Sequence, residues 1–166
     1  GAWLLEPGVV DRARLPGRME RFDFALPPKL QGGRQTVPII MDGAHVPFNI
    51  EAVLRDITHS SSVNGDCVAV VALASDKDAP GFLSVLSRYV AYAIFTEASG
   101  SGRAHAAKDL QALAVSAGMA CEAEPDPHLA LDRAAVKAAE RSGWILVTGS
   151  LYLVGALRAT VMSRAL

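Results

Sequence analysis

The strongest constraint on the fold is a regular alternation of short apolar segments with longer segments of helical spacing. The apolar segments predict six strands, which lie around Phe22 and Phe24 and at Val37–Met41, Cys67–Leu73, Tyr89–Phe95, Met119–Glu122 and Trp144–Val147. The segments between them predict five helices, which begin at Pro47 and Pro80 and cover Arg103–Val115, Pro127–Arg141 and Leu151–Met162. Strands that are apolar throughout are typical of a mostly parallel sheet with helices on both faces. The sequence therefore predicts an α/β, Rossmann-like three-layer sandwich.

Two polar residues, Asp42 and His45, directly follow the predicted strand Val37–Met41. They therefore lie at the carboxyl end of a strand, where open α/β sheets bind ligands, because the next helix points the positive end of its dipole there. Pro47 suits the first turn of that helix, where a missing N–H costs nothing. A purely structural alternative stays open, in which Asp42 is a turn or cap acceptor and His45 an ordinary loop histidine.

The composition argues against several classes of partner. The 16 basic and 17 acidic side chains leave a net charge of -1, so no basic surface for nucleic acid or for an anionic membrane is expected. The longest apolar runs are far shorter than the roughly 20 residues of a membrane-spanning helix. Cys67 and Cys121 lack metal-ligand spacing, and we interpret both as buried thiols. They favour a reducing compartment, the cytoplasm or an organelle interior.

No motif in the chain predicts chemistry by itself. The phosphate-binding pattern GxxxxGK[ST] does not occur, so we expect no independent ATP hydrolysis. Gly100-Ser101-Gly102 begins a dinucleotide pattern but does not complete it. The four histidines are scattered, and we expect neither a metal site nor a catalytic residue within this chain.

Four motifs in order resemble those of the folylpolyglutamate synthase and dihydrofolate synthase family, a branch of the Mur ligases. Asp42–Pro47 (DGAHVP) is similar to the family's DGAHNP motif, and Leu15–Glu20 (LPGRME) to its PGRLE-type linker. Ala74–Asp78 (ASDKD) resembles its ADKD loop, and Thr148–Val154 its TGSLYLV segment. Val46 departs from the pattern, because it replaces the family's usual Asn.

The resemblance implies a ligase in which ATP phosphorylates the terminal carboxylate of a folate or dihydropteroate, and the amino group of L-glutamate then attacks the acyl phosphate. Residues 1–20 would be an interdomain linker, and residues 21–166 the C-terminal, glutamate-ligase domain of the Mur ligase type. An N-terminal P-loop ATPase domain, absent from this chain, would hold most of the ATP, the Mg²⁺ and the folate. The isolated domain is then expected to be inactive, and no redox cofactor is expected.

The resemblance also implies an ATP-binding set made of Arg18, Asp42 and His45. A guanidinium stays charged and can bind phosphate oxygens in a bidentate way, which suits Arg18. The carboxylate of Asp42 can accept hydrogen bonds from ribose hydroxyls, and the imidazole of His45 can donate to a phosphate. The structural alternative for Arg18 is a solvated linker arginine.

A second set, for glutamate, is implied at Lys77, Ser150 and Tyr152. Lys77 matches a lysine that recognises an amino-acid carboxylate, although an isolated Asp-Lys-Asp is usually a solvated turn. Ser150 would hold a carboxylate at the start of the last helix, or serve as an ordinary helix cap. Tyr152 would line the same pocket or simply pack. We expect Arg103 and His105 to begin a helix and to be exposed.

Two rival functions remain open on the sequence alone. Other Mur ligases join different amino acids to cell-wall precursors with a similar last domain, so the substrate could differ. A non-catalytic small-molecule-binding module could also have kept the fold.

Overall fold

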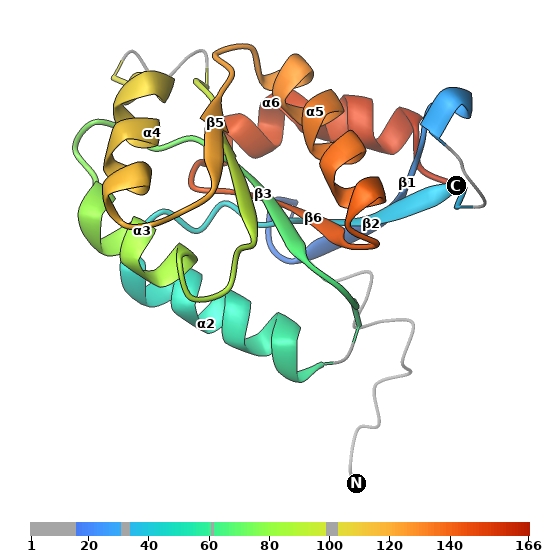
Figure 1. Cartoon of the computed structure of the whole chain (residues 1–166), viewed down its shortest axis with the longest axis horizontal. Helices are drawn as coiled ribbons and strands as arrows, with labels where there is room; N and C mark the ends of the chain where they lie inside the picture. Colours follow the sequence, from blue (N-terminus) through green and yellow to red (C-terminus); the bar gives the residue numbers. More distant parts are fainter. Residues whose placement is uncertain (1–15, 31–33, 61, 99–102) are drawn as a thin grey trace, which may run out of the picture.

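The computed structural model describes residues 16–30, 34–60, 62–98 and 103–166 (Figure 1). Within these residues the chain forms a six-stranded sheet in the order β1-β2-β6-β3-β4-β5. The strands are β1 (Glu20–Ala25), β2 (Thr36–Met41), β3 (Cys67–Val71), β4 (Tyr92–Phe95), β5 (Cys121–Ala123) and β6 (Trp144–Thr148). β1 pairs with β2 in antiparallel fashion, and all other pairs are parallel. The predicted six-stranded, mostly parallel sheet is thus confirmed.

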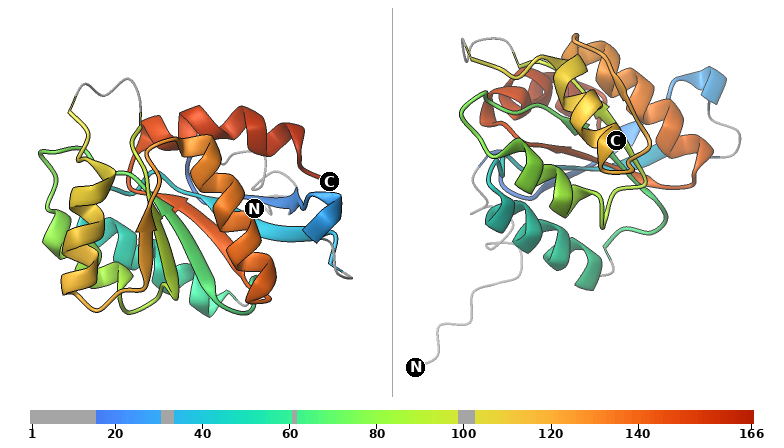
Figure 2. Two further views of the ribbon diagram at one scale, coloured as in Figure 1. Left: turned by 45° about the horizontal axis from the view of Figure 1, so that its top comes forward. Right: turned by 60° about the vertical axis from the view of Figure 1, so that its left-hand side comes forward.

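Helices cover both faces of this sheet (Figures 1 and 2). The helical elements are η1 (Pro28–Leu30, a 3-10 turn), α2 (Pro47–His59), α3 (Ala79–Leu86), α4 (Ala107–Ser116), α5 (Pro127–Glu140) and α6 (Leu151–Ser163). The buried side chains of α2, α3 and α4 share one core cluster, and those of α5 and α6 share the other. The three-layer α/β sandwich is therefore also confirmed.

The central strand β3 shows why its sequence is apolar throughout. Val68 and Val70 belong to the core beneath α5 and α6, whereas Ala69 and Val71 belong to the core beneath α2, α3 and α4. Successive side chains of a strand point to opposite faces, so a sheet covered on both sides needs apolar residues at every position. Because the parallel strands all end at one edge, the loops that follow β2, β3 and β6 gather there.

One predicted helix begins later than expected. The segment expected to start it at Arg103 instead runs beside the chain that leaves β3. The N–H of Ser75 donates to the carbonyl of Arg103 at 2.6 Å, and the N–H of His105 donates to the carbonyl of Leu73 at 2.8 Å. These tertiary hydrogen bonds hold Arg103 and His105 in an extended conformation, so α4 starts only at Ala107.

Three predicted strands also have bounds that differ from the structure by two or three residues. β3 ends at Val71 instead of Leu73, and the predicted strand Met119–Glu122 is displaced to Cys121–Ala123. β4 begins at Tyr92, because the preceding residues Tyr89 and Val90 donate to the carbonyl of Leu86 and close α3. The central residues of the predicted turn Gln31–Gln35, and the Gly100–Gly102 segment, lie outside the described residues.

The two cysteines are free, and they differ in burial. Cys67 is buried as predicted, whereas Cys121 is partly exposed at the edge strand β5, so that prediction was wrong for the second thiol. Throughout the described segments, no helix has the length and apolar character needed to cross a membrane.

Candidate functional site

The loops after β2 and β6 are fastened together at the carboxyl edge of the sheet. The N–H of Asp42 donates to the carbonyl of Val147 at 3.0 Å, and the N–H of Gly149 donates to the carbonyl of Ala44 at 2.9 Å. The Thr148 hydroxyl also donates to the Ala44 carbonyl, at 3.3 Å. The residues that follow both strands are therefore held in fixed positions next to one another.

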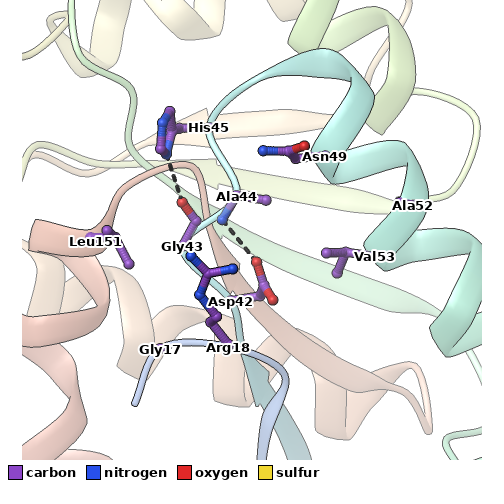
Figure 3. Close-up of a pocket in the computed structure, with 10 residues that line it drawn as sticks. All are labelled: Gly17, Arg18, Asp42, Gly43, Ala44, His45, Asn49, Ala52, Val53 and Leu151. Atoms are coloured by element: carbon purple, nitrogen blue, oxygen red, sulfur yellow. Dashed lines mark hydrogen bonds between the residues drawn. The ribbon is translucent and has the colours of Figure 1, made fainter. Parts of the chain in front are cut away.

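Two adjoining hollows open at this edge. The first hollow has a volume of about 260 Å³, and Figure 3 shows its lining, which consists of Gly17, Arg18, Asp42, Gly43, Ala44, His45, Asn49, Ala52, Val53 and Leu151. The second hollow has a volume of about 320 Å³ and is lined by His45, Ala74, Asp76, Lys77, Arg103, Gly149, Ser150, Leu151 and Tyr152. His45 and Leu151 line both.

The structure places all six expected site residues in these hollows. Those expected to bind ATP, which are Arg18, Asp42 and His45, line the first hollow. Those expected to bind glutamate, which are Lys77, Ser150 and Tyr152, line the second. Their ligands stay predictions, whereas their grouping into two neighbouring sites is a property of the fold.

The turn that carries Arg18 is clamped to the domain. The N–H of Gly17 donates to Oε1 of Glu20 at 2.6 Å, and the carbonyl of Gly17 accepts from the N–H of Gly43 at 2.8 Å. Arg158 of α6 donates to both carboxylate oxygens of Glu20, from Nε to Oε1 and from Nη2 to Oε2, each at 3.0 Å, and Nε also lies 3.2 Å from Oε2. The hydrogen bond from Arg158 holds the pKa of Glu20 below its ordinary value of 4.5, although partial burial opposes the shift.

Asp42 serves first as a turn acceptor. Its Oδ1 accepts the N–H of Ala44 at 2.8 Å, and its Oδ2 accepts the N–H of Met19 at 3.0 Å. Only 7% of the residue is exposed. Burial raises the pKa of Asp42 above its ordinary value of 3.8, against the two backbone hydrogen bonds and the charge of Arg18. Each carboxylate oxygen keeps a further lone pair, so the structural role leaves room for a ribose hydroxyl.

The orientation of His45 is set by its own loop. Nδ1 lies 3.0 Å from the carbonyl oxygen of Gly43, as Figure 3 shows. A carbonyl can only accept, so Nδ1 carries the hydrogen and the neutral ring offers Nε2 as an acceptor. Donation from Nε2 to a phosphate, as the family resemblance implied, therefore requires a protonated ring.

Ser150 caps the helix that borders the second hollow. Its Oγ accepts the N–H of Tyr152 at 3.1 Å and the N–H of Leu153 at 3.3 Å, so the helix-cap interpretation is confirmed. Its hydroxyl hydrogen stays able to donate to a ligand. Tyr152 is 59% exposed, so core packing does not account for it.

Gly149 allows the tight turn between β6 and α6. Its φ of +96° is unfavourable for other residues, and a Cβ there would lie 2.1 Å from the carbonyl oxygen of Ala72. The turn from β6 into α6 can therefore pass this close to the end of β3 only without a side chain.

Two cations face the second hollow without a carboxylate partner among the described residues. Lys77 is half-buried, and its neighbour Asp78 caps α3 by accepting the N–H of Gly81 at 3.0 Å. Arg103 is exposed as expected, yet it lines the hollow beside Lys77. Sequence reasoning did not predict that Arg103 lines a hollow. The signal that could have indicated it is the position of this charged residue, just after a Gly-Ser segment that follows a predicted strand.

Other positions also differed from expectation. Asn49, which lines the first hollow, carried no sequence signal of its own. Asp76, which lines the second, belongs to the ASDKD motif but was not singled out as a site residue. His105 was expected to be exposed, but it is half-buried, and its Nε2 has no partner among the described atoms. In the parts of the chain that the structure covers, no three His, Cys, Asp or Glu side chains gather as a metal site.

Comparison with known proteins decides the family. A family model described as the Mur ligase, glutamate ligase domain matches residues 17–151, most of the chain. The chain belongs to this family. The Mur ligase membership that the four motifs implied is thus confirmed, and the matched region contains both hollows except for Tyr152.

Several solved structures similar to this Mur ligase domain are folylpolyglutamate synthases. The enzyme from Mycobacterium tuberculosis, complexed with ADP and AMPPCP, has a TM-score of 0.74 at 23% identity, over 89% of this chain and 32% of that one. FolC from E. coli, in complex with DHPP and ADP, has a TM-score of 0.70 at 24% identity, over 92% and 32%. The bifunctional folylpolyglutamate synthase/dihydrofolate synthase from Yersinia pestis has a TM-score of 0.69 at 26% identity, over 90% and 32%.

A curated relative of this Mur ligase domain belongs to another branch. UDP-N-acetylmuramoyl-L-alanyl-D-glutamate--2,6-diaminopimelate ligase from Bacillus cereus is 33% identical over 91 residues, which are 53% of this chain and 16% of that protein. The chain thus spans about a third of the solved relatives and less than a fifth of the curated one.

Proposed function

We propose that this chain is the C-terminal domain of an ATP-dependent ligase that adds L-glutamate to a folate or dihydropteroate through an acyl phosphate. Residues 1–20 would be the linker to an N-terminal P-loop ATPase domain, and residues 21–166 the domain that closes over the nucleotide. The observation that carries the proposal is the pair of adjoining hollows, which hold the two expected ligand sets and share His45. The solved relatives with ADP, AMPPCP or DHPP support it.

In this proposal the first hollow meets the ATP phosphates and ribose. Arg18 has no ion-pair partner among the described residues, and the clamp between Glu20 and Arg158 fixes the turn from which it projects. A guanidinium fixed in this way can neutralise phosphate charge without being reorganised during the reaction. Mg²⁺ would accompany the nucleotide and neutralise phosphate charge, and we assign its ligands to the ATPase domain because the described residues offer no acidic cluster.

The second hollow suits an amino acid with two carboxylates. Lys77 and Arg103 supply two cations, and Ser150 supplies a hydroxyl at the positive end of α6. The N–H of Leu151, in the first turn of α6, donates to no atom of the described chain and is free for a carboxylate oxygen. An amino group held between these anchors would face His45.

The contribution of this domain is mainly positioning. ATP and the folate carboxylate form the acyl phosphate, and the domain brings the amine to it in a fixed orientation. Such positioning can supply a large part of a rate enhancement, because it replaces a bimolecular encounter with an intramolecular one. The isolated domain lacks a phosphate-binding loop and is therefore proposed to be inactive alone.

The test is ATP-dependent transfer of radiolabelled glutamate to dihydropteroate and to tetrahydrofolate by the full-length ligase that contains this domain. Lys77→Met and Ser150→Ala should raise the KM for glutamate. Asp126→Ala is a matched control for Ser150→Ala, because Asp126 caps α5 with the same pair of hydrogen bonds but lines neither hollow. Equal effects of the two cap variants on KM would contradict a glutamate site at Ser150.

A second candidate is a Mur-type ligase for another amino acid, which the match to the diaminopimelate ligase favours. Incorporation of diaminopimelate into a muramoyl peptide, without incorporation of glutamate into either folate, would support it. Nucleotide binding without any incorporation would instead support a non-catalytic binding module.

A further inference from the structure

His45 is the only ionisable side chain, among the described residues, that lines both hollows. Leu151, which also lines both, cannot exchange a proton. If the first hollow holds the phosphates and the second holds the amino acid, the new bond forms where the two meet. His45 lies at that meeting point, and any part it takes in the reaction rests on the proposed ligase function.

The ring of His45 is prepared to accept a proton. Its Nδ1–H points to the Gly43 carbonyl at 3.0 Å, which leaves the lone pair of Nε2 free in the neutral ring. The preceding residue, Ala44, is held through both of its backbone groups, since its N–H donates to Asp42 and its carbonyl accepts from the N–H of Gly149. The acceptor atom is therefore fixed by backbone contacts without any ligand.

The reaction needs such an acceptor. The amino group of a free amino acid is an ammonium near neutral pH and cannot attack until it loses a proton. We propose that Nε2 of His45 takes this proton from the bound ammonium, which frees the nitrogen lone pair. The lone pair forms the C–N bond, the bond from the acyl carbon to the phosphate oxygen breaks, and the phosphate leaves with that electron pair. The second proton, which the nitrogen loses on becoming an amide, goes to the departing phosphate.

The other charged groups around the two hollows are less suited to this task. Arg18, Lys77 and Arg103 are cations and have no acceptor. Asp42 is buried, and both of its oxygens already accept backbone N–H groups. Among the described residues that line the second hollow, Asp76 is the remaining charged acceptor, but it is exposed, and carboxylates are weaker bases than imidazoles.

Two assays on the full-length ligase separate this role from phosphate binding. The first follows glutamate addition to the folate acceptor that the wild-type enzyme uses. The second replaces glutamate with hydroxylamine, which is largely unprotonated at neutral pH and traps the acyl phosphate as a hydroxamate without a base. His45→Asn is the informative variant, because its side-chain amide can still donate to the Gly43 carbonyl but offers no basic nitrogen. Asp76→Asn is the matched control.

His45→Asn is expected to slow glutamate addition by about a hundredfold or more, while hydroxamate formation stays close to that of the wild type. Imidazole added to His45→Ala should restore glutamate addition, which keeps the test usable if the Asn variant folds poorly. Equal loss in both assays, no loss in either, or the same split with Asp76→Asn would overturn the proposal. A wild-type enzyme that forms no hydroxamate would overturn the ligase function itself.

Discussion

Substitution of Gly149 tests the closest backbone approach at the site. A Cβ at this position would lie 2.1 Å from the carbonyl oxygen of Ala72, which belongs to the chain leaving β3 and cannot rotate away. The φ of +96° adds a conformational penalty of about 1–2 kcal/mol for any residue with a Cβ. Forced overpacking costs a further amount of about 1–3 kcal/mol. Gly149→Ala should therefore lower the free energy of unfolding by about 2–5 kcal/mol.

Two other glycines of the chain provide matched controls. Gly118 has a φ of +81°, but no heavy atom lies within 4 Å of its ideal Cβ, so Gly118→Ala should cost only the conformational part, about 1–2 kcal/mol. Gly155 lies inside α6 with the same open surroundings, and Gly155→Ala should stabilise by about 0.5–1 kcal/mol, because it removes a flexible residue from a helix.

The assay is urea unfolding of the 166-residue chain, followed by circular dichroism. A difference of about 2 kcal/mol between Gly149→Ala and Gly118→Ala would separate the two midpoints by roughly 1 M urea, for an m-value of about 2 kcal/mol/M. If the two variants had the same midpoint, the close approach of β6–α6 to β3 would be refuted. The positive φ alone would then explain the glycine.

Three further predictions concern the turn and loop at the first hollow. Arg158 lowers the pKa of Glu20, so the ionised carboxylate stabilises the fold at pH values above its ordinary pKa of 4.5, and this stabilisation is lost as the pH falls through the lowered pKa. Glu20→Gln should therefore remove this part of the loss of stability in acid, which urea midpoints measured between about pH 6 and about pH 3 would reveal. Asp42→Ala should destabilise the chain by about 1–3 kcal/mol, because two backbone N–H groups lose their acceptor, and an unchanged urea midpoint would contradict this. In the full-length ligase, Arg18→Ala should raise the KM for ATP. His128→Ala is the control and should leave this KM unchanged, because His128 lies at an exposed position of α5 outside both hollows. Equal effects of the two variants would argue against a nucleotide at the first hollow.

Much of the fold was readable from local patterns. The period of apolar residues identified the six strands and the five α-helices of the described residues, although not the 3-10 turn η1, because burial on one or two faces imposes a fixed spacing. The ends of elements were less predictable where distant backbone decided them. Arg103 and His105 have the sequence of a helix start, yet hydrogen bonds to Ser75 and Leu73 keep them extended.

In the candidate site, too, some features were predictable from the sequence, and others depended on contacts between distant residues. Motif resemblance selected all six expected residues, whereas local sequence reasoning predicted only that Arg103 begins a helix on the surface. The contact between Glu20 and Arg158 that holds the turn of Arg18 was also not predicted. The two residues are separated by 138 positions in the sequence and become neighbours only in the folded chain. The tautomer of His45 depends on a carbonyl two residues away, which no spacing rule would have singled out.

The sequence by itself determined the class of fold and the position of polar residues at the ends of strands, because hydrophobic periodicity and glycine and proline positions act over short distances. Only the tertiary structure decided which of these ends are neighbours. The last strand, β6, is inserted between β2 and β3, and this brings Ser150 beside His45 and both beside Lys77. Strand order depends on the packing of complete layers, so residues far apart in the chain form one pair of adjoining hollows.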